Sequence, residues 1–285
     1  MTDTRDNVQM NIAVVMTCHN RRNLTIACLR SLKEQTILTG EAENKGYSLS
    51  LWLLDDASTD GTAEAVKKEW PGANITTGDG KRYWCGGMRE AWERAAGADP
   101  DYFLLMNDDT TLEHDALEQL LRLAPTPEDR VIAVAAIADP RCGRVVFGGH
   151  KGHKLTPVQP AGKAEECDTM NANCTLITRA VRRSIGGLHS FYTHSMGDFD
   201  YGFAASRRGI RIVQSPKVLG FSEPNPTKGT WRDKELSKTE RLELLWLSPT
   251  RGLPFLEWCT YCFRNHGWRW LYKCFSPTIR ILAGK

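Results

Sequence analysis

The chain has 285 residues, of which 41% are hydrophobic and 25% charged, so it can bury a full core as one large or two small globular units. The net charge of +3 is too small to indicate a nucleic-acid partner, and no RNP, zinc-finger or basic-repeat pattern is present. Nine scattered cysteines without a secretory signal indicate a reducing compartment rather than a disulfide framework. The longest apolar run, at 131–138, is far shorter than the ~20 residues that cross a bilayer.

Strand and helix patterns alternate in the first part of the chain. Apolar and β-branched runs predict strands at 11–17, 50–54, 73–77 and 103–106, with helical periodicity between them and a helix at 88–96. This order predicts an α/β fold with a right-handed, mostly parallel sheet flanked by helices. In such sheets ligands bind outside the carboxyl ends of the strands.

From about residue 131 the pattern changes to short strands, turns and glycines, which predicts a second half built on the same continuous sheet. We expect a flexible N-terminus at 1–10 and a main domain at 11–230. An α/β half followed by irregular strands suggests a nucleotide half at 11–125 and an acceptor half at 126–230. The remaining segment, 231–285, is predicted to be helical and amphipathic.

The run YFLLMNDDT at 102–110 ends a buried strand in two adjacent carboxylates, Asp108 and Asp109, preceded by Asn107. Adjacent carboxylates repel, and a divalent cation at this strand end would explain why they stay together. Hard oxygen ligands beside open positions suit Mg²⁺ or Mn²⁺ carrying substrate phosphates. The alternative is that Asn107 and Asp108 form a turn and Asp109 caps a helix beginning at Leu112.

Two further polar loops follow strands that neighbour this one in the predicted sheet. After the second strand, the carboxylates of Asp55 and Asp56 can accept hydrogen bonds from a nucleobase imide or from ribose hydroxyls. Residues 60–62 are expected to act mainly in structure, for example as a helix cap. The loop after the first strand contributes three candidate nucleotide-sugar contacts, Thr17, His19 and Asn20.

The segment 78–88 combines cations, aromatic residues and a glycine pair before the predicted helix. At Gly86 and Gly87 the backbone can approach a diphosphate closely, and free N–H groups at a helix start attract anions. Arg82 is a further donor contact, and Trp84 can cover a sugar face. The alternatives are a plain flexible loop and an aromatic packing anchor.

A second acidic helix start lies at 197–200. An inverting sugar transfer needs a carboxylate that takes the proton of the attacking hydroxyl, and we assign this role to Asp198. Asp200 is expected to hold the helix start or an acceptor hydroxyl, and His194 is expected to contact the acceptor or serve as an alternative base. Both acids can also simply cap the helix and interact with its dipole.

Taken in order, the motifs NIAVVMTCHNR, LLDDASTDGT, LLMNDDT and GDFDYGFAASRRG resemble the family-2 glycosyltransferases of GT-A fold over about residues 11–220. The run YWCGGMREAWERA followed by MNDDT is most similar to the bacterial rhamnosyl- and galactofuranosyl-transferase branch, which acts on cell-surface polysaccharides. The resemblance implies that 107–109 corresponds to the D-x-D metal motif, with Asp109 the direct ligand beside Asp108. It also implies that Asp56 binds nucleotide and that Asp198 is the catalytic base.

The tail, 251–285, carries six cations and one acid, Glu257, among Trp and Phe side chains. This composition fits a helix in the interface of an anionic membrane. Packing on the main domain or on a partner subunit of a homo-oligomer is the alternative. With no transmembrane run, we expect a cytoplasmic protein, peripheral at the inner face of the plasma membrane.

These patterns together predict a metal-dependent, inverting glycosyltransferase. It would move a sugar such as rhamnose or galactofuranose from a nucleoside diphosphate donor to a hydroxyl of a surface glycan or lipid-linked acceptor. One alternative is a sugar nucleotidyltransferase, although the loop at 18–22 lacks the glycines expected after its first strand. The other is a non-catalytic glycan-binding protein on the membrane face.

Overall fold

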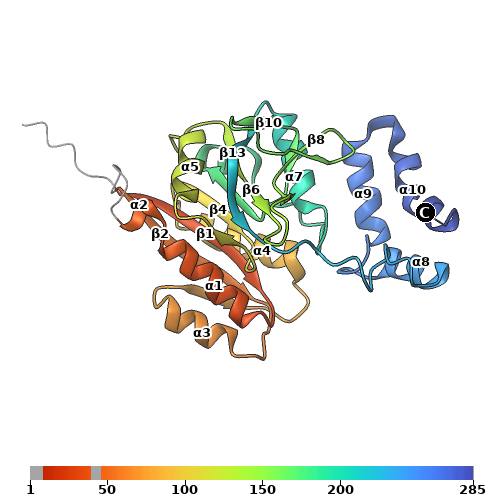
Figure 1. The fold of residues 1–285 in the computed structure, drawn as a ribbon, viewed down its shortest axis with the longest axis horizontal. Coiled ribbons are helices and arrows are strands. Elements are labelled where there is room, and N and C mark those ends of the chain that lie inside the picture. The colour runs from red at the N-terminus through yellow and green to blue at the C-terminus, as the bar shows by residue number, and fades with distance from the viewer. Residues whose placement is uncertain (1–8, 40–45, 285) are drawn as a thin grey trace, which may run out of the picture.

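A single ten-stranded mixed sheet runs through the protein, and helices cover both of its faces (Figure 1). The computed structural model describes residues 9–39 and 46–284. Most of the predicted flexible N-terminus, 1–10, lies outside these residues, and Met10 already belongs to the first strand. The strand order is β10-β13-β6-β12-β4-β1-β2-β3, with β5 paired to β13 and β7 paired to β6, which confirms the prediction of an α/β fold built on one continuous sheet.

The first part of the chain forms the parallel half of the sheet, with β4, β1, β2 and β3 side by side. Its elements are β1 (Met10–Cys18), α1 (Arg22–Lys33), α2 (Thr36–Thr39), β2 (Tyr47–Asp55), α3 (Thr62–Glu69), β3 (Asn74–Thr77), α4 (Tyr83–Ala96) and β4 (Tyr102–Met106).

The second part extends the sheet through β12, which is antiparallel to both β4 and β6. Its elements are β5 (Thr111–Leu112), α5 (Ala116–Leu123), β6 (Val131–Ala138), β7 (Val145–Phe147), β8 (Gly149–Lys151), β9 (Thr156–Pro157), β10 (Glu165–Cys167), β11 (Thr169–Met170), β12 (Cys174–Thr178), α6 (Arg179–Ile185), α7 (Gly197–Ser206) and β13 (Arg211–Phe221). The short strands β11, β8 and β9 form a separate small sheet. The proposed boundary near residue 125 stays a prediction.

The core has two layers, because the central strands are buried on both faces. In β1, Ile12, Val14 and Met16 face α1 and α5, whereas Ala13 and Val15 face α4. Successive side chains of β1 thus point to opposite faces of the sheet, and they are apolar on both faces. This is the pattern of a central strand in a sheet covered by helices on both sides. Helices packed on both faces of the sheet therefore hold the carboxyl end of β1 in place.

Three helices and one 3-10 turn form a C-terminal lobe beside the sheet domain (Figure 1): α8 (Lys238–Leu247), α9 (Phe255–Asn265), η1 (Gly267–Arg269) and α10 (Trp270–Leu282). This confirms the predicted helical C-terminus. Cys259 of α9 and Cys274 of α10 form a disulfide, which corrects the expectation that the cysteines take no part in such a bond. Sequence spacing concealed this pair because its two members lie on different helices.

Among residues 9–39 and 46–284, no helix combines the length and apolarity that spanning a bilayer requires.

Gly87 sets the approach of α4 to β1. A Cβ at this position would lie 2.8 Å from Thr17 Cβ and would overlap the Thr17 hydroxyl oxygen. At Gly86, one residue earlier, the nearest atom to such a Cβ is 3.7 Å away, an ordinary contact distance. The glycine pair therefore has one member that packing requires and one that it does not.

We expect Gly87→Ala to destabilise the protein by about 1–3 kcal/mol, because the added methyl forces α4 away from β1. Gly86→Ala is the matched control and should be neutral or stabilising by up to about 1 kcal/mol, since alanine favours helix more than glycine does. Urea unfolding followed by circular dichroism measures both. Equal stability of the two variants would contradict this packing argument.

Candidate functional site

Three loops meet at one edge of the sheet, as the sequence predicted. The strands β1, β2 and β4 are parallel neighbours, and the last residues of β1 and β2, Cys18 and Asp55, lie in register. The ends of these strands and the loops that follow them contain the predicted residues of segments 17–20, 55–56 and 107–109, whereas those of segment 82–87 lie at the start of α4, after β3. Topology alone therefore brings together side chains that are far apart in the sequence.

The acidic pair at the end of β4 is bridged by a guanidinium group. Arg21 Nη1 donates to Asp108 Oδ1 at 3.2 Å and to Asp109 Oδ2 at 2.6 Å. The Asp108 side chain is only 7% exposed, and burial raises the pKa of its carboxyl to about 6, although Arg21 acts in the opposite direction. Ser222 donates to the other Asp109 oxygen at 3.4 Å. Arg21 thus offsets part of the repulsion between the adjacent carboxylates.

The alternative role of Asp109 as a helix cap is wrong. Residues Thr111–Leu112 form strand β5, and helix α5 begins only at Ala116. Asp109 instead faces Arg21 and Ser222. Its side chain is 24% exposed, so of the two acids it is the more accessible to a ligand.

Asp56 shapes the loop that leads into α4. Its Oδ1 accepts the N–H of Gly80 at 2.8 Å, and its Oδ2 accepts the N–H groups of Arg82 and Tyr83 at 2.9 and 3.0 Å. The neighbouring Asp55 accepts the N–H of Ser58 at 2.9 Å. Both acids are 3% exposed and hold backbone in the free protein, so base or ribose contacts through them stay a prediction.

The start of α4 differs from the sequence expectation in position and in chemistry. The helix begins at Tyr83 rather than at 88, so Gly86 and Gly87 lie inside it. The N–H groups of Cys85 and Gly86 donate to the Thr193 carbonyl at 2.9 and 3.2 Å. The N–H groups of this helix start therefore have acceptors within the protein, and a diphosphate contact at Gly86 and Gly87 stays a prediction.

Trp84 joins the two halves of the site. Its indole N–H donates to Asn107 Oδ1 at 2.7 Å, and its backbone N–H donates to His194 Nδ1 at 3.4 Å. The residue is partly buried, so its ring is fixed between the end of β4 and the loop before α7. Burial, with the nearby Arg21 charge, lowers the pKa of His194 to about 4, which keeps its imidazole neutral near neutral pH.

Asp198 lies in the first turn of α7 and is oriented by three donors. Its Oδ2 accepts Asn171 Nδ2 and the Ala172 N–H, both at 3.3 Å, and its Oδ1 accepts the Phe199 N–H at 2.8 Å. Burial raises the pKa of the carboxyl above its usual value, and a higher pKa makes its carboxylate a stronger base. The preceding Gly197 packs closely on Cys85 of α4.

Asp200 has a different role from its neighbour. It is 1% exposed and accepts Arg264 Nε at 2.9 and 3.0 Å and Asn265 Nδ2 at 2.8 Å, both from α9. Glu257, also on α9, accepts the N–H and the hydroxyl of Thr193 at 3.1 and 2.6 Å. These contacts join the C-terminal lobe to the candidate site at two places. A contact between Asp200 and the acceptor substrate stays a prediction.

The remaining predicted residues belong to the loops around the crevice. Thr17 donates to the Leu54 carbonyl at 3.1 Å, and His19 Nδ1 lies 2.6 Å from the Asp56 carbonyl. Asn20 accepts the Thr59 N–H at 2.8 Å. Arg82 is exposed and lies 3.4 Å from the Glu90 carboxylate. These contacts join the first two loops and leave Arg82 at the rim.

Backbone strain gathers at the same edge. Left-handed φ angles at non-glycine residues are uncommon, and within the described chain four of the six occur in these loops: Asn20, Ala57, Tyr83 and Met196. Strained backbone persists where the surrounding structure over-determines it, as in binding and catalytic sites. This independent feature therefore marks the same region as the acidic residues do.

Sequence reasoning missed three contributors, namely Arg21, Asn171 and Ser222. The sequence could have indicated Arg21, since this cation lies in the loop after β1 while acids lie in the loop after β4. Asn171 and Ser222 have none, because only the folded chain brings them to Asp198 and Asp109.

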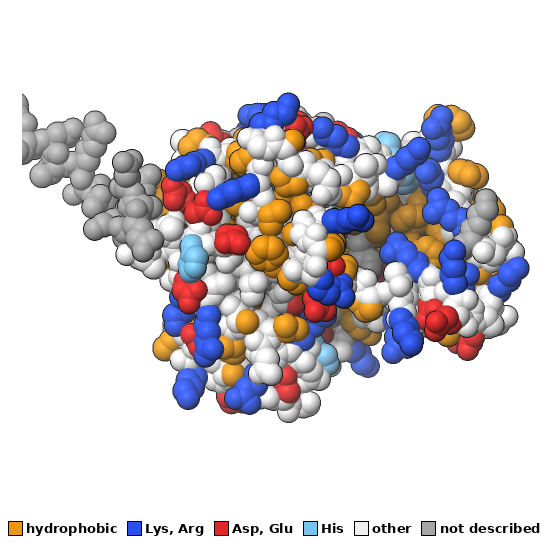
Figure 2. Space-filling model, viewed as in Figure 1, with side chains coloured by type: hydrophobic (Ala, Val, Ile, Leu, Met, Phe, Trp, Pro, Cys, Tyr) orange, Lys and Arg blue, Asp and Glu red, His pale blue; other side chains and the backbone are white. Residues whose placement is uncertain are grey.

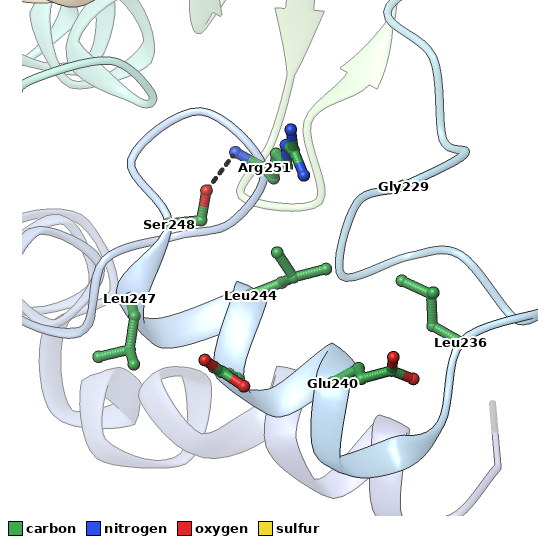
Figure 3. Close-up of a pocket in the computed structure, with 8 residues that line it drawn as sticks. Gly229, Leu236, Glu240, Leu244, Leu247, Ser248 and Arg251 are labelled. Carbon is green, nitrogen blue, oxygen red and sulfur yellow. Dashed lines mark hydrogen bonds between the residues drawn. The ribbon is translucent and has the colours of Figure 1, made fainter.

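A pocket of about 490 Å³ lies elsewhere, beside α8 (Figure 3). Its lining includes Leu244, Leu247, Glu240 and Arg251. Glu240 is already used in the capping box with Ser237 at the start of α8. None of the candidate site residues lines this pocket.

A mixed sheet covered by helices on both faces, with acidic residues after adjacent parallel strands, defines an α/β protein. Residues 13–185 match the glycosyl transferase family 2 domain. The chain belongs to this family and is a glycosyltransferase.

Solved structures with a similar overall fold include proteins in complex with nucleotide sugars. One is the mannosyltransferase PcManGT from Pyrobaculum calidifontis in complex with GDP-Man and Mn²⁺, with 16% identity, a TM-score of 0.56, and coverage of 95% of this chain and 68% of that one. Another is S. aureus TarS 1-349 in complex with UDP-GlcNAc, with 14% identity, a TM-score of 0.55, and coverage of 95% and 72%. At these identities, the likeness shows the GT-A fold.

One curated relative matches a short segment. A probable beta-glucosidase L from Emericella nidulans is 32% identical over 79 residues, which cover 28% of this chain and 11% of that protein. Such a short overlap carries no conclusion about activity.

The electrostatics of His194 predict how stability depends on pH. Its pKa is about 4 in the folded protein against 6.5 ordinarily, so on acidification the unfolded chain takes up this proton first. Stability is therefore lost as pH falls from about 6.5 toward 4, and from pH ~7 to ~5 the His194 contribution is about 1–2 kcal/mol.

In His194→Gln, the loss of stability between these pH values should be smaller by that amount, as measured by urea unfolding at each pH. His114→Gln, at an exposed position, is the control and should retain the wild-type loss. An unchanged loss in His194→Gln would contradict the burial argument.

Proposed function

We propose that the protein is a metal-dependent, inverting glycosyltransferase that moves a sugar from a nucleoside diphosphate donor to a hydroxyl of a surface glycan or lipid-linked acceptor. The observation that carries this proposal is the bridge made by Trp84. One residue contacts both Asn107 at the acidic strand end and His194 in the loop before Asp198. A donor held at the acidic pair would therefore lie next to the candidate base.

The residues present fit a divalent cation of the Mg²⁺ or Mn²⁺ type. The described residues contain no group of three His, Cys, Asp or Glu arranged around one point, so a complete protein cage is not the mode of binding. Mg²⁺ is usually held by one or two carboxylates together with substrate phosphates, and Asp108 and Asp109 supply that number. When bound, such an ion stabilises the charge that develops on a leaving diphosphate. A similar fold that holds Mn²⁺ beside GDP-Man supports this assignment.

The chain's own residues divide the remaining work. Asp198, oriented by Asn171 and Ala172, takes the proton of the attacking acceptor hydroxyl. The imidazole of His194, in the loop before α7, is neutral and offers a contact to the acceptor substrate. Trp84, fixed by Asn107, presents its ring to the sugar between these groups. No covalent enzyme intermediate is required, so the product should have the inverted configuration.

The donor and acceptor are narrower proposals. The motif resemblance supports rhamnose or galactofuranose as the transferred sugar and a cell-surface polysaccharide as the product. A nucleotide-sugar donor is supported by the GDP-Man and UDP-GlcNAc held by proteins of similar fold. Incubation with a panel of nucleotide sugars and Mn²⁺ tests the proposal. Release of nucleoside diphosphate supports it, whereas release of pyrophosphate from a nucleoside triphosphate would indicate a nucleotidyltransferase.

Substitution of Asp198 by Asn should lower kcat by about 10²-fold or more while the donor Kd stays within about threefold, because only proton transfer is lost. The conservative control is Asp99→Asn, at an exposed position in the loop before β4, which should keep kcat. Kinetics with a saturating donor and isothermal titration of the donor measure the two quantities. A near-normal kcat in Asp198→Asn would exclude it as the base.

Cation binding should depend on the nucleotide. Because Arg21 offsets part of the charge of the acidic pair and only two carboxylates are at hand, we expect Mn²⁺ alone to bind weakly and its affinity to rise at least ~10-fold when the matching nucleoside diphosphate is present. Calorimetric titration of Mn²⁺ with and without GDP or UDP measures this change. Asp109→Ala should abolish the nucleotide-dependent gain. Equal Mn²⁺ affinity with and without every diphosphate tested would contradict the shared-ligand arrangement.

A further inference from the structure

Large hydrophobic side chains are exposed almost entirely on the C-terminal lobe. In the part of the chain that the structure describes, ten of the twelve exposed side chains of this kind lie from Leu247 onward, and Trp268 is 85% exposed. Figure 2 shows hydrophobic and basic side chains interspersed over the visible face of this lobe. Contiguous exposed apolar surface marks an interaction site in a soluble fold.

Helix α10 has two apolar stripes on opposite sides. Trp270, Cys274, Pro277 and Ile281 follow helical spacing and pack inward against α8 and α9. A second apolar set is exposed on another side of the helix: Leu271, Phe275, Ile279 and Leu282, continued by Trp268 of the preceding turn η1. The inward stripe accounts for the folding of the lobe, so the outward stripe needs another partner.

Three cations lie on the flank of the helix between its exposed apolar side and its buried stripe. Arg269, Lys273 and Arg280 recur at intervals of four and seven residues, which places them on one side of the helix. The sequence contains no Asp or Glu after Glu257. Glu257 itself points inward, since it accepts hydrogen bonds from Thr193. The outer face of α9 and α10 is therefore apolar and purely cationic.

We propose that the outward face of α10, continued by the exposed residues of α9, binds the interface of an anionic membrane. An apolar stripe that enters the headgroup boundary beside Lys and Arg side chains is the arrangement of an interfacial helix, and tryptophan favours that depth. A second copy of the chain fits less well. A two-fold dimer through α10 would bring like charges together with no acid on α10 to offset them.

The lobe would hold the crevice close to the membrane. α9 contacts the candidate site through Arg264 to Asp200 and through Glu257 to Thr193. A lobe lying on lipid would thus place the acceptor side of the crevice within reach of a lipid-linked saccharide. The membrane contact itself rests only on the α9 and α10 surface and not on the donor chemistry.

Flotation of the full-length protein with vesicles tests this surface without any substrate. We expect binding to vesicles of phosphatidylcholine mixed with phosphatidylglycerol, much weaker binding to pure phosphatidylcholine, and loss of binding as salt is raised. Each removed interfacial cation should lower partitioning about fivefold, so Arg269→Glu with Arg280→Glu should lower it at least ~25-fold. The matched control, Lys67→Glu with Lys68→Glu on α3, changes the net charge equally and should bind as wild type.

A second pair of variants tests the apolar stripe. Leu271→Ser with Phe275→Ser should lower partitioning at least tenfold, whereas Leu24→Ser, at an exposed position on α1, should not. Thermal unfolding should show similar Tm values, since all three side chains are exposed. Absence of binding to anionic vesicles would overturn the proposal, and a stable dimer that the Leu271→Ser with Phe275→Ser change dissociates would assign the surface to a second copy. Donor hydrolysis by a protein that does not bind vesicles would overturn the membrane surface alone.

Discussion

The arrangement of the candidate site depends on how the first turn of α4 is held. The backbone N–H groups of this turn have no acceptors within the helix, and two distant segments of the chain provide those acceptors. Asp56 binds the N–H groups of Arg82 and Tyr83, and the Thr193 carbonyl binds those of Cys85 and Gly86. The end of β2, the start of α4 and the loop before α7 therefore form one unit. Trp84 sits within this unit and links it to the end of β4.

Charge balance is the second constraint on this edge of the sheet. The buried Asp108 and the more accessible Asp109 share the Arg21 guanidinium, which allows two adjacent carboxylates to remain in the folded free protein. A donor diphosphate with its cation would change this balance, because both acids and Arg21 would gain new partners of opposite charge. Arg21, in the short segment after β1, thus contacts the two acids and would also contact the diphosphate of the proposed complex.

The C-terminal lobe combines a structural and a proposed targeting role. Its inner face contacts the candidate site, because an ion pair between Arg264 and the buried Asp200 joins α9 to the first turn of α7. Its outer face carries the exposed apolar and basic stripes. A single pair of helices therefore connects the surface proposed to meet lipid with the residue proposed to act as base, Asp198, two positions from Asp200.

The sequence by itself determined the elements and the sheet edge that carries the acids. Strand runs such as 103–106, and the polar residues that end them, are local patterns set by burial, and parallel topology then fixes where they meet. Only the tertiary structure decided the start of α4, the bridging role of Arg21 and the Cys259–Cys274 bond. Each of these depends on partners from other segments. Local propensity and spacing carry no information about such contacts, because hydrogen bonds and ion pairs across the fold form only after the chain has folded.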